Sequence, residues 1–206
     1  MTPQSSKDAS LPDQRADRLT GDLQGAVLRA ARREDMPTID AMHFLSVQAL
    51  GAADYSPAEL EAFICHGTYD PAMIDDGTYF ILEQKGRVIA SGGWSRRLPQ
   101  SASPGAGMDD HGFSLSPSSA KIRSIFVHPK YARRGLGSLV VRHAEAEAVA
   151  AGYRLLELWA TLTGVPLYRK LGYQDVGRMA IPGGNGTCVP AVHMAKLVPL
   201  SDADVA

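Results

Sequence analysis

A turn in the second half of the chain places two arginines and two glycines at the expected start of a helix. The segment from Arg133 to Ser138 reads Arg-Arg-Gly-Leu-Gly-Ser and follows an apolar strand that ends at Val127. The first amides of a helix lack hydrogen-bond partners and carry partial positive charge, so they bind anions. Glycines let a ligand approach the main chain because they have no Cβ atom. This combination predicts a site for a phosphate or pyrophosphate group.

Two other phosphate-binding motifs do not fit this turn. The chain contains no Gly-x-x-x-x-Gly-Lys-Ser/Thr sequence, which a P-loop requires. Gly135 and Gly137 lack the third glycine of the dinucleotide fingerprint, and the unit lies late in the chain instead of opening a βαβ repeat. From the residues alone, a plain turn stays open as the alternative to an anion site.

A second segment with possible chemistry follows about thirty residues downstream. Leu155 to Ala160 predicts a buried strand, and Gly164 to Tyr173 predicts a short helix. Pro166 suits the first turn of that helix, and Gly172 suits its left-handed end. Tyr168 lies within the helix, where simple packing is the alternative to a chemical role.

Both segments resemble the GNAT superfamily of acyl-CoA-dependent N-acyltransferases. The turn is similar to motif A, Gln/Arg-x-x-Gly-x-Gly/Ala, with Ala132 in place of its first residue. The family holds the pyrophosphate mainly through main-chain amides, so this departure weakens the match only slightly. Leu167 to Tyr173 resembles the family's Phe/Leu-Tyr-x-x-Leu-Gly-Phe/Tyr signature.

The resemblance implies acetyl-CoA as the co-substrate. It places Tyr168 opposite the coenzyme sulfur as the catalytic residue, and Thr161 where relatives often have an asparagine that contacts the coenzyme. A main-chain N–H near Val127 would hold the thioester carbonyl oxygen. The candidate coenzyme-binding residues are Ile125, Phe126, Val127, Arg133, Arg134, Gly135, Leu136, Gly137, Ser138 and Thr161.

The residues do not single out a general base. Some family members use a glutamate at the start of the strand before motif A, but this chain has Lys121 there, which we expect not to serve. Glu61, His66 and Glu157 are conceivable bases, although a surface or packing role is the better interpretation of each. The six histidines show no metal-binding spacing, so we expect no metal.

We therefore expect an N-acetyltransferase that moves an acetyl group from acetyl-CoA to a primary amine. The amine, a small molecule in preference to a protein, would attack the thioester directly in a ternary complex. The alternative is a catalytically weak acyl-CoA-binding sensor or interaction module, suggested by the missing glutamate. Segments 52–76 and 96–120 are expected to form the acceptor side.

Composition limits the other classes of protein and partner. The 206 residues carry a formal net charge of -1, so no basic field indicates nucleic acid or an anionic membrane. No apolar run reaches the roughly 18 residues of a membrane helix, and no signal peptide is recognisable. We expect a cytoplasmic protein and leave a homodimer possible. Cys65 and Cys188 are expected to be buried small apolar residues.

The pattern of polar and apolar residues predicts one domain with two tails. Residues 1–25 are expected to be a disordered tail, 26–200 a single domain, and 201–206 a short tail. Within the domain, the Ser-, Pro- and Gly-rich segment 96–120 predicts a long loop between two strands.

The expected fold is α/β (α+β), with a mixed, mostly antiparallel central sheet flanked by helices, as in the GNAT resemblance. Strands are expected near 27–31, 78–83, 88–95, 121–127, 155–160, 173–181 and 190–198. Helices are expected near 33–50, from Pro57, over 137–151 and near 165–171. Ser56 and Glu59 predict a capping box for the second helix. In the 137–151 helix, Arg142 and Glu145 are expected to face away from the core.

Overall fold

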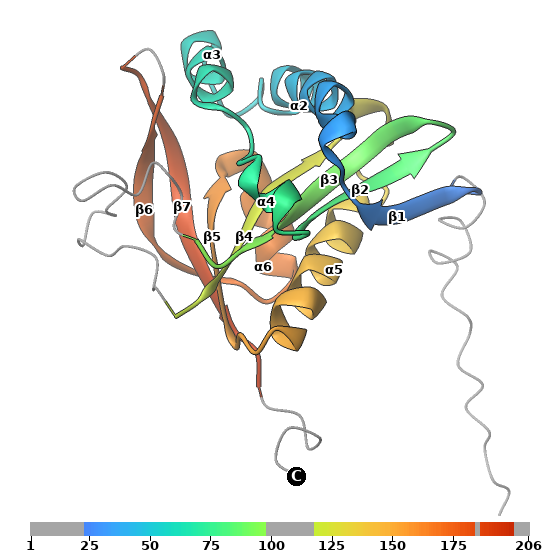
Figure 1. Cartoon of the computed structure of the whole chain (residues 1–206). Coiled ribbons are helices and arrows are strands. Elements are labelled where there is room, and N and C mark those ends of the chain that lie inside the picture. Colours follow the sequence, from blue (N-terminus) through green and yellow to red (C-terminus); the bar gives the residue numbers. More distant parts are fainter. Residues whose placement is uncertain (1–22, 98–117, 184–185, 200–206) are drawn as a thin grey trace, which may run out of the picture.

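The computed structural model describes residues 23–97, 118–183 and 186–199 of the chain. Its centre is a seven-stranded sheet in the order β1-β2-β3-β4-β5-β7-β6 (Figure 1). The strands are β1 Ala26–Ala30, β2 Tyr79–Gln84, β3 Arg87–Ser95, β4 Ala120–Val127, β5 Leu155–Thr161, β6 Gln174–Pro182 and β7 Cys188–Leu197. Every neighbouring pair is antiparallel except β4 and β5. The expected mixed, mostly antiparallel sheet is confirmed.

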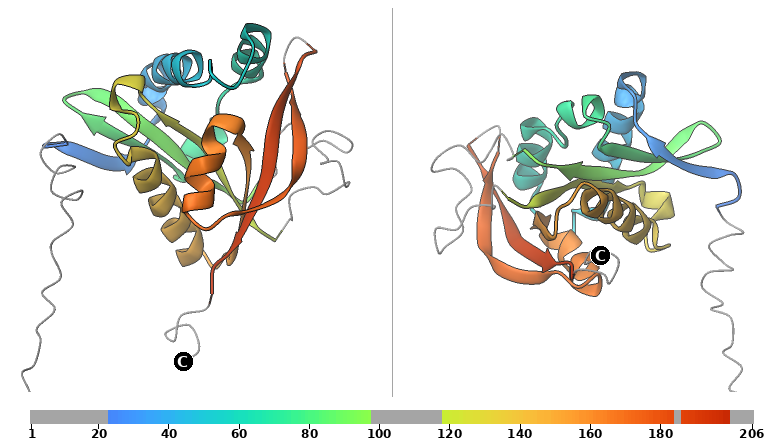
Figure 2. Two further views of the ribbon diagram at one scale, coloured as in Figure 1. Left: turned by 180° about the vertical axis from the view of Figure 1, so that it is seen from behind. Right: turned by 60° about the horizontal axis from the view of Figure 1, so that its bottom comes forward.

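Helices cover both faces of this sheet. The α-helices are α2 Met36–Leu50, α3 Pro57–His66, α4 Ala72–Asp75, α5 Leu136–Ala150 and α6 Val165–Lys170, with short 3-10 turns at Arg33–Asp35, Pro129–Tyr131 and Leu162–Gly164. Both α2 and α5 pack on β3 and β4, and Figure 2 shows them on opposite faces. The sequence analysis did not predict α4, which is a single turn.

Two apolar clusters hold these layers together. On the α5 face, side chains of α5 pack against β4 and β5, with Ile122, Val141, Ala144, Leu156 and Leu158 at the centre. On the α2 face, Ile39, Met42, Met73, Tyr79 and Ile81 form the second cluster. Each Val, Ile, Leu or Met side chain in these clusters contributes roughly 1.5–3 kcal/mol when it leaves water. Because Phe126 of β4 packs against the α2-side cluster and Ile122 belongs to the other, both faces of β4 are anchored.

Local signals define the ends of α3 and α6 as expected. The Ser56 hydroxyl accepts from the Glu59 N–H, while the Glu59 carboxylate accepts from the Ser56 N–H at 2.7 Å. This reciprocal pair is a capping box, which satisfies two main-chain donors. Pro166 lies in the first turn of α6 and Gly172 has a φ of 90° just after it, where a side chain would be strained.

The parallel pairing of β4 with β5 is short. It joins Ala120 to Leu156 and Lys121 to Glu157, at the beginning of both strands. Beyond that point β4 stays paired with β3, while β5 stays paired with β7 (Figure 1). The two strands therefore diverge, and their facing main-chain groups are left for another partner.

A β-bulge redirects the side chains of β4 beside this divergence. Ser91 pairs with Phe126 and Gly93 pairs with Arg123, so two residues of β4 lie opposite the single Gly92. One of the two, Ser124, has a φ of 58°. A Cβ atom at Gly92 would lie 2.3 Å from the Ile125 Cδ1 atom and 3.2 Å from the Ile125 Cα atom, and the φ of 156° is one that other residues rarely adopt, so glycine is favoured there. The bulge lets Ile125 pack toward α5 and Phe126 toward α2.

Two expectations about burial are wrong. Glu145 is buried instead of facing solvent, because Lys196 of β7 donates to its two carboxylate oxygens at 3.0 and 2.9 Å. Cys65 and Cys188 are exposed free thiols instead of buried apolar residues. Cys65 lies at the end of α3 and Cys188 at the start of β7, and only the packing of those elements decides which side faces water.

Other expectations concern segments that the structure does not describe. The N-terminal tail lies outside the described residues up to position 22, as does most of the 96–120 loop (98–117) and the tail 201–206. Ala120 itself begins β4, so the loop ends one residue earlier than expected. Among the described residues, no helix is both long and apolar enough to cross a membrane.

Candidate active site

Two cavities lie along the divergence of β4 and β5. The first, which we call the acceptor cavity after the role proposed for it below, has a volume of about 180 Å³ and reaches from β4 and β5 to the α3–α4 connection. The second, the coenzyme cavity, has a volume of about 140 Å³ and reaches to the starts of α5 and α6. Both are lined by Phe63, Ile125, Phe126 and Thr161. Molecules bound in the two cavities would therefore meet at β4.

The coenzyme cavity brings together many of the residues assigned from sequence. Val127 and Gly137 line it beside the shared Ile125, Phe126 and Thr161. A Cβ atom at Gly137 would lie 3.1 Å from the Leu167 Cδ2 atom of α6, so the glycine keeps this end of α5 close to α6. Apart from Glu59, the lining is apolar or carries hydroxyl groups, which suits a slender chain with few charges.

The turn before α5 lies next to this cavity and is open to solvent. Gly135 caps α5 with a φ of 83°, and Arg133 and Arg134 before it are exposed. The Arg134 guanidinium lies over the Tyr131 ring, with its Cζ atom 5.6 Å from the ring centre. The unpaired amides of the first helical turn and two nearby cations form the kind of site that an anion requires.

Leu136 and Ser138 contribute to the same turn in different ways. The Leu136 side chain is buried in the α5-side core, so only its main-chain N–H is available to a ligand. Ser138 is half-buried in the first turn of α5. Five of the candidate coenzyme residues line neither cavity: Arg133, Arg134, Gly135, Leu136 and Ser138. The other five line the coenzyme cavity: Ile125, Phe126, Val127, Gly137 and Thr161.

Tyr168 lies on α6 and lines the acceptor cavity. Its side chain is 8% exposed, and its ring makes an edge contact with the Tyr173 ring at 5.8 Å between centres. Burial raises the pKa of the Tyr168 phenol because the charged form loses water. The phenol therefore keeps its proton at neutral pH and can donate a hydrogen bond into the cavity.

A buried polar chain supports the bulge of β4 from the α2 side. The His43 ring contacts the Thr68 hydroxyl at 2.6 Å and the Ser91 hydroxyl at 2.7 Å. The Tyr79 hydroxyl lies 3.1 Å from Ser91 Oγ and 3.4 Å from the Ser124 carbonyl oxygen, to which it donates. Burial lowers the pKa of His43 to about 3, so the ring is neutral.

The Tyr79 hydroxyl donates to Ser91 Oγ and to the Ser124 carbonyl oxygen, and it also lies 3.1 Å from His43 Nε2. The tautomer of the neutral His43 ring sets which of its two nitrogens donates to its hydroxyl partner. Thr68 and Ser124 both line the acceptor cavity, so this chain fixes two parts of its wall.

Of the charged groups on the wall of the acceptor cavity, Arg123 was not singled out from the sequence, and Lys121 was considered only as a replacement for a glutamate base. Lys121, Arg123 and Asp70 line the cavity. Lys121 is fully buried, its Nζ atom donates to the Ser119 carbonyl at 2.6 Å, and burial lowers its pKa. The signal was present in the alternation of Lys121 and Arg123 with apolar neighbours in β4, which places both on one face.

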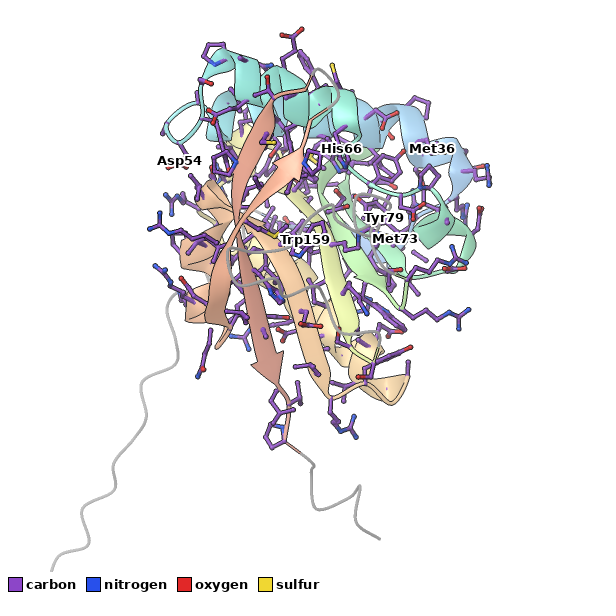
Figure 3. All side chains as sticks on the ribbon, turned by 90° about the vertical axis from the view of Figure 1, so that its left-hand side faces the viewer. Met36, Asp54, His66, Met73, Tyr79 and Trp159 are labelled. Atoms are coloured by element: carbon purple, nitrogen blue, oxygen red, sulfur yellow. The ribbon has the colours of Figure 1, made fainter. Side chains whose placement is uncertain are left out.

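Two of the conceivable bases differ in their surroundings. Glu157 is buried, where it accepts from the Ser119 hydroxyl and lies 3.0 Å from His193 Nε2. His66 is exposed at the end of α3 and lines the acceptor cavity. Figure 3 labels His66 and also Trp159 of β5, another residue of that lining. Among the described residues, no three His, Cys, Asp or Glu side chains cluster as metal ligands.

Known proteins resemble this chain in sequence pattern and in fold. Residues 43–173 match the family model described as the acetyltransferase (GNAT) family. No curated protein sequence matches the chain.

Solved structures share the fold at low sequence identity. A GCN5-related N-acetyltransferase from Rhodopseudomonas palustris is 22% identical, with a TM-score of 0.66 over 85% of this chain and 97% of its own. The PaiA N-acetyltransferase of Thermoplasma acidophilum, solved with coenzyme A, is 14% identical, with a TM-score of 0.58 over 84% and 98%. A ribosomal-protein-alanine N-acetyltransferase from Brucella melitensis is 16% identical, with a TM-score of 0.55 over 84% and 99%.

Proposed function

Because this chain belongs to the acetyltransferase (GNAT) family, we propose that it transfers an acetyl group from acetyl-CoA to the primary amine of a small molecule. Membership makes it an acyl-CoA-dependent acyltransferase. The proposal adds that the acceptor is a small primary amine and that it attacks the thioester directly in a ternary complex. It also adds that the reaction needs no metal ion and takes place in the cytoplasm.

One observation carries this proposal: two cavities meet where β4 leaves β5. The coenzyme cavity begins at the amide-rich start of α5, and the acceptor cavity contains Tyr168. A thioester bound along β4 would present its carbonyl carbon at the junction, where Phe126 and Thr161 line both spaces. An acceptor cavity of about 180 Å³ suits a small amine better than a folded protein surface. The coenzyme A complex of the Thermoplasma protein supports the same use of the fold.

The residues of the chain would assist three parts of the reaction. Main-chain N–H groups of β4 near Val127 would hold the carbonyl oxygen as negative charge develops on it. The Tyr168 phenol would donate a hydrogen bond to the departing thiolate. Full proton transfer would come late, because burial raises the pKa of this phenol further above that of a thiol, about 8.5.

The acceptor must lose a proton before or during attack. A lysine-like amine with a pKa near 10.4 is about 3 units from neutral pH, so exposing its lone pair costs roughly 4–5 kcal/mol. Direct attack therefore predicts that the rate of thiol release rises with pH, up to tenfold per unit, until it approaches the pKa of the acceptor.

The experiment is a panel of small amines with acetyl-CoA, in which free thiol and acetylated product are both measured. The proposal expects steady thiol release that depends on the amine and equals the product formed. Thiol release without acetylated amine would contradict it. Binding of the coenzyme with no turnover for any amine would favour the alternative, a catalytically weak acyl-CoA-binding sensor or interaction module.

A further inference from the structure

The acceptor cavity has aromatic walls and a charged rim on one strand. Phe63, Phe126, Trp159 and Tyr168 contribute rings to the lining. Within β4, Arg123 is separated by one residue from Lys121, so both side chains reach the same face of the sheet and both line the cavity. An acceptor that fills this space has an apolar body and meets positive charge at one side.

Arg123 is largely buried, but its ion pair is long. Its side chain is 18% exposed, and its carboxylate neighbour, Asp70, lies 3.7 Å from Nη1, beyond hydrogen-bond distance. Nη1 itself is buried and has no hydrogen-bond partner among the described residues. By contrast, Arg33 reaches Asp75 at 2.6 and 2.7 Å although it is 69% exposed.

This contrast indicates an incomplete site at Arg123. A buried guanidinium loses its water, and the loss lowers its pKa, because the charged form is then disfavoured. Such a group is stable when oxygen acceptors fill its planar fork. Asp70 does not fill it, because its Oδ1 atom accepts from the Ala72 N–H at 2.9 Å and its Oδ2 atom stays at 3.7 Å from Arg123.

Lys121 does not have the same capacity. Its Nζ atom donates to the Ser119 carbonyl, and the Glu157 carboxylate lies beside it across the parallel pair of β4 and β5. The charge of Lys121 is therefore balanced by a neighbouring strand. Among the described arginines and lysines of the lining, Arg123 is the one with a buried N–H group that lacks a hydrogen-bond partner.

We propose that the acceptor carries a carboxylate in addition to its amine, and that the Arg123 guanidinium binds this carboxylate in the acceptor cavity. The inference rests on the proposed function. A small amino acid or amino-acid-like amine with an apolar side chain has both groups and a body that suits the aromatic walls. A small shift of the Arg123 side chain within the cavity would bring two of its N–H groups onto the two carboxylate oxygens.

Matched acceptor pairs test the role of the carboxylate. The pairs are leucine and isoamylamine, phenylalanine and phenethylamine, β-alanine and ethylamine, and γ-aminobutyrate and propylamine, so that the distance between amine and carboxylate varies. With kcat/KM calculated on the concentration of unprotonated amine, because a carboxylate lowers the pKa of a nearby amine, we expect at least one carboxylate-bearing member to exceed its partner by tenfold or more. Higher kcat/KM for the carboxylate-free amine in every pair would overturn the inference while leaving the proposed function intact.

Variants locate the effect at Arg123. Arg123→Gln keeps the length and removes the charge, so kcat/KM for the preferred carboxylate acceptor should fall at least tenfold, mostly through KM, with little change for its carboxylate-free partner. Arg123→Lys should recover part of the loss, because it restores charge without the planar fork. Arg33→Gln is the matched control, since it removes an exposed arginine that is paired to Asp75 of α4. It should leave kcat/KM unchanged for both acceptors of the pair. An equal loss for both members of the pair would show a structural role instead.

A binding measurement separates the two hypotheses. N-acetyl-leucine and N-isoamylacetamide are titrated by calorimetry into the protein with coenzyme A present. We expect N-acetyl-leucine to bind the wild-type protein more tightly than N-isoamylacetamide does. This difference in affinity should disappear in Arg123→Gln. That result without turnover of any amine would uphold the carboxylate site and reject the proposed transfer. Equal binding of both compounds, or none, would reject the carboxylate site.

Discussion

The Tyr168 hydroxyl offers the sharpest test of how this chain would assist thiolate departure. Tyr168→Phe removes the oxygen and keeps the ring, including its edge contact with Tyr173. The phenol is buried and its pKa is raised, so it enters the reaction protonated and as a hydrogen-bond donor. A hydrogen bond to a charged group contributes about 1.5–3 kcal/mol. Since about 1.4 kcal/mol is a factor of ten, kcat should fall about 10- to 100-fold.

The assay measures initial rates of thiol release with an amine acceptor identified in the panel, together with the affinity for coenzyme A. The affinity should change less than twofold, because the lost interaction forms only as the thiolate develops. Tyr173→Phe is the matched control: it deletes the hydroxyl of the neighbouring ring and should keep kcat. Full activity in Tyr168→Phe would refute the catalytic assignment. A lowered melting temperature with unchanged kcat would show that Tyr168 acts by packing.

Three further outcomes are expected. Gly135→Glu should weaken coenzyme A binding at least tenfold by calorimetry, because it adds bulk and negative charge at the start of α5. The control Gly86→Glu adds the same charge at another position of positive φ and should leave the affinity unchanged. Equal affinities of the two variants for coenzyme A would show that this turn is not the anion site. Deletion of residues 1–21 should change the melting temperature by no more than a few degrees, and a large drop would show that this segment packs on the domain or on a second subunit. Arg29 holds the pKa of Asp35 below its usual range, so the stability from this pair is present above about pH 4 and is lost as pH falls further. Asp35→Asn should therefore cost about 1 kcal/mol in urea unfolding at pH 6 and much less at pH 3, and equal costs at both would contradict the linkage.

Much of the fold was predictable because its signals act over a few residues. Ser56 and Glu59 cap α3 within one turn, and Gly172 ends α6 next to it. The alternation and length of apolar runs located all seven strands to within a few residues. The signature around Tyr168 and the turn at Gly135 also lie within short segments, so they carried the resemblance to the family, and that resemblance implied the candidate coenzyme residues.

The burial of individual charges was not predictable in the same way. Glu145 was expected on the surface of its helix, but Lys196, about fifty positions later, pairs with it and allows it to be buried. Arg123 and Asp70 are also more than fifty positions apart, and neither forms part of a motif. A sequence pattern shows which residues share a face of a helix or strand. It does not show which distant element covers that face.

The sequence by itself determined the order of the seven strands and of every described α-helix except α4, and the glycine turn at the start of α5, because these follow from contacts and periodicities within short segments. The resemblance of two of those segments to family motifs indicated the family. Only the tertiary structure decided where β4 separates from β5, since that depends on strands β3 and β7 holding them on opposite sides. The separation creates both cavities and brings the Tyr168 ring and the incompletely paired guanidinium of Arg123 to one of them. Side chains from distant segments acquire a shared environment only when the sheet has formed, and that environment decides which of their charges and protons are available for chemistry.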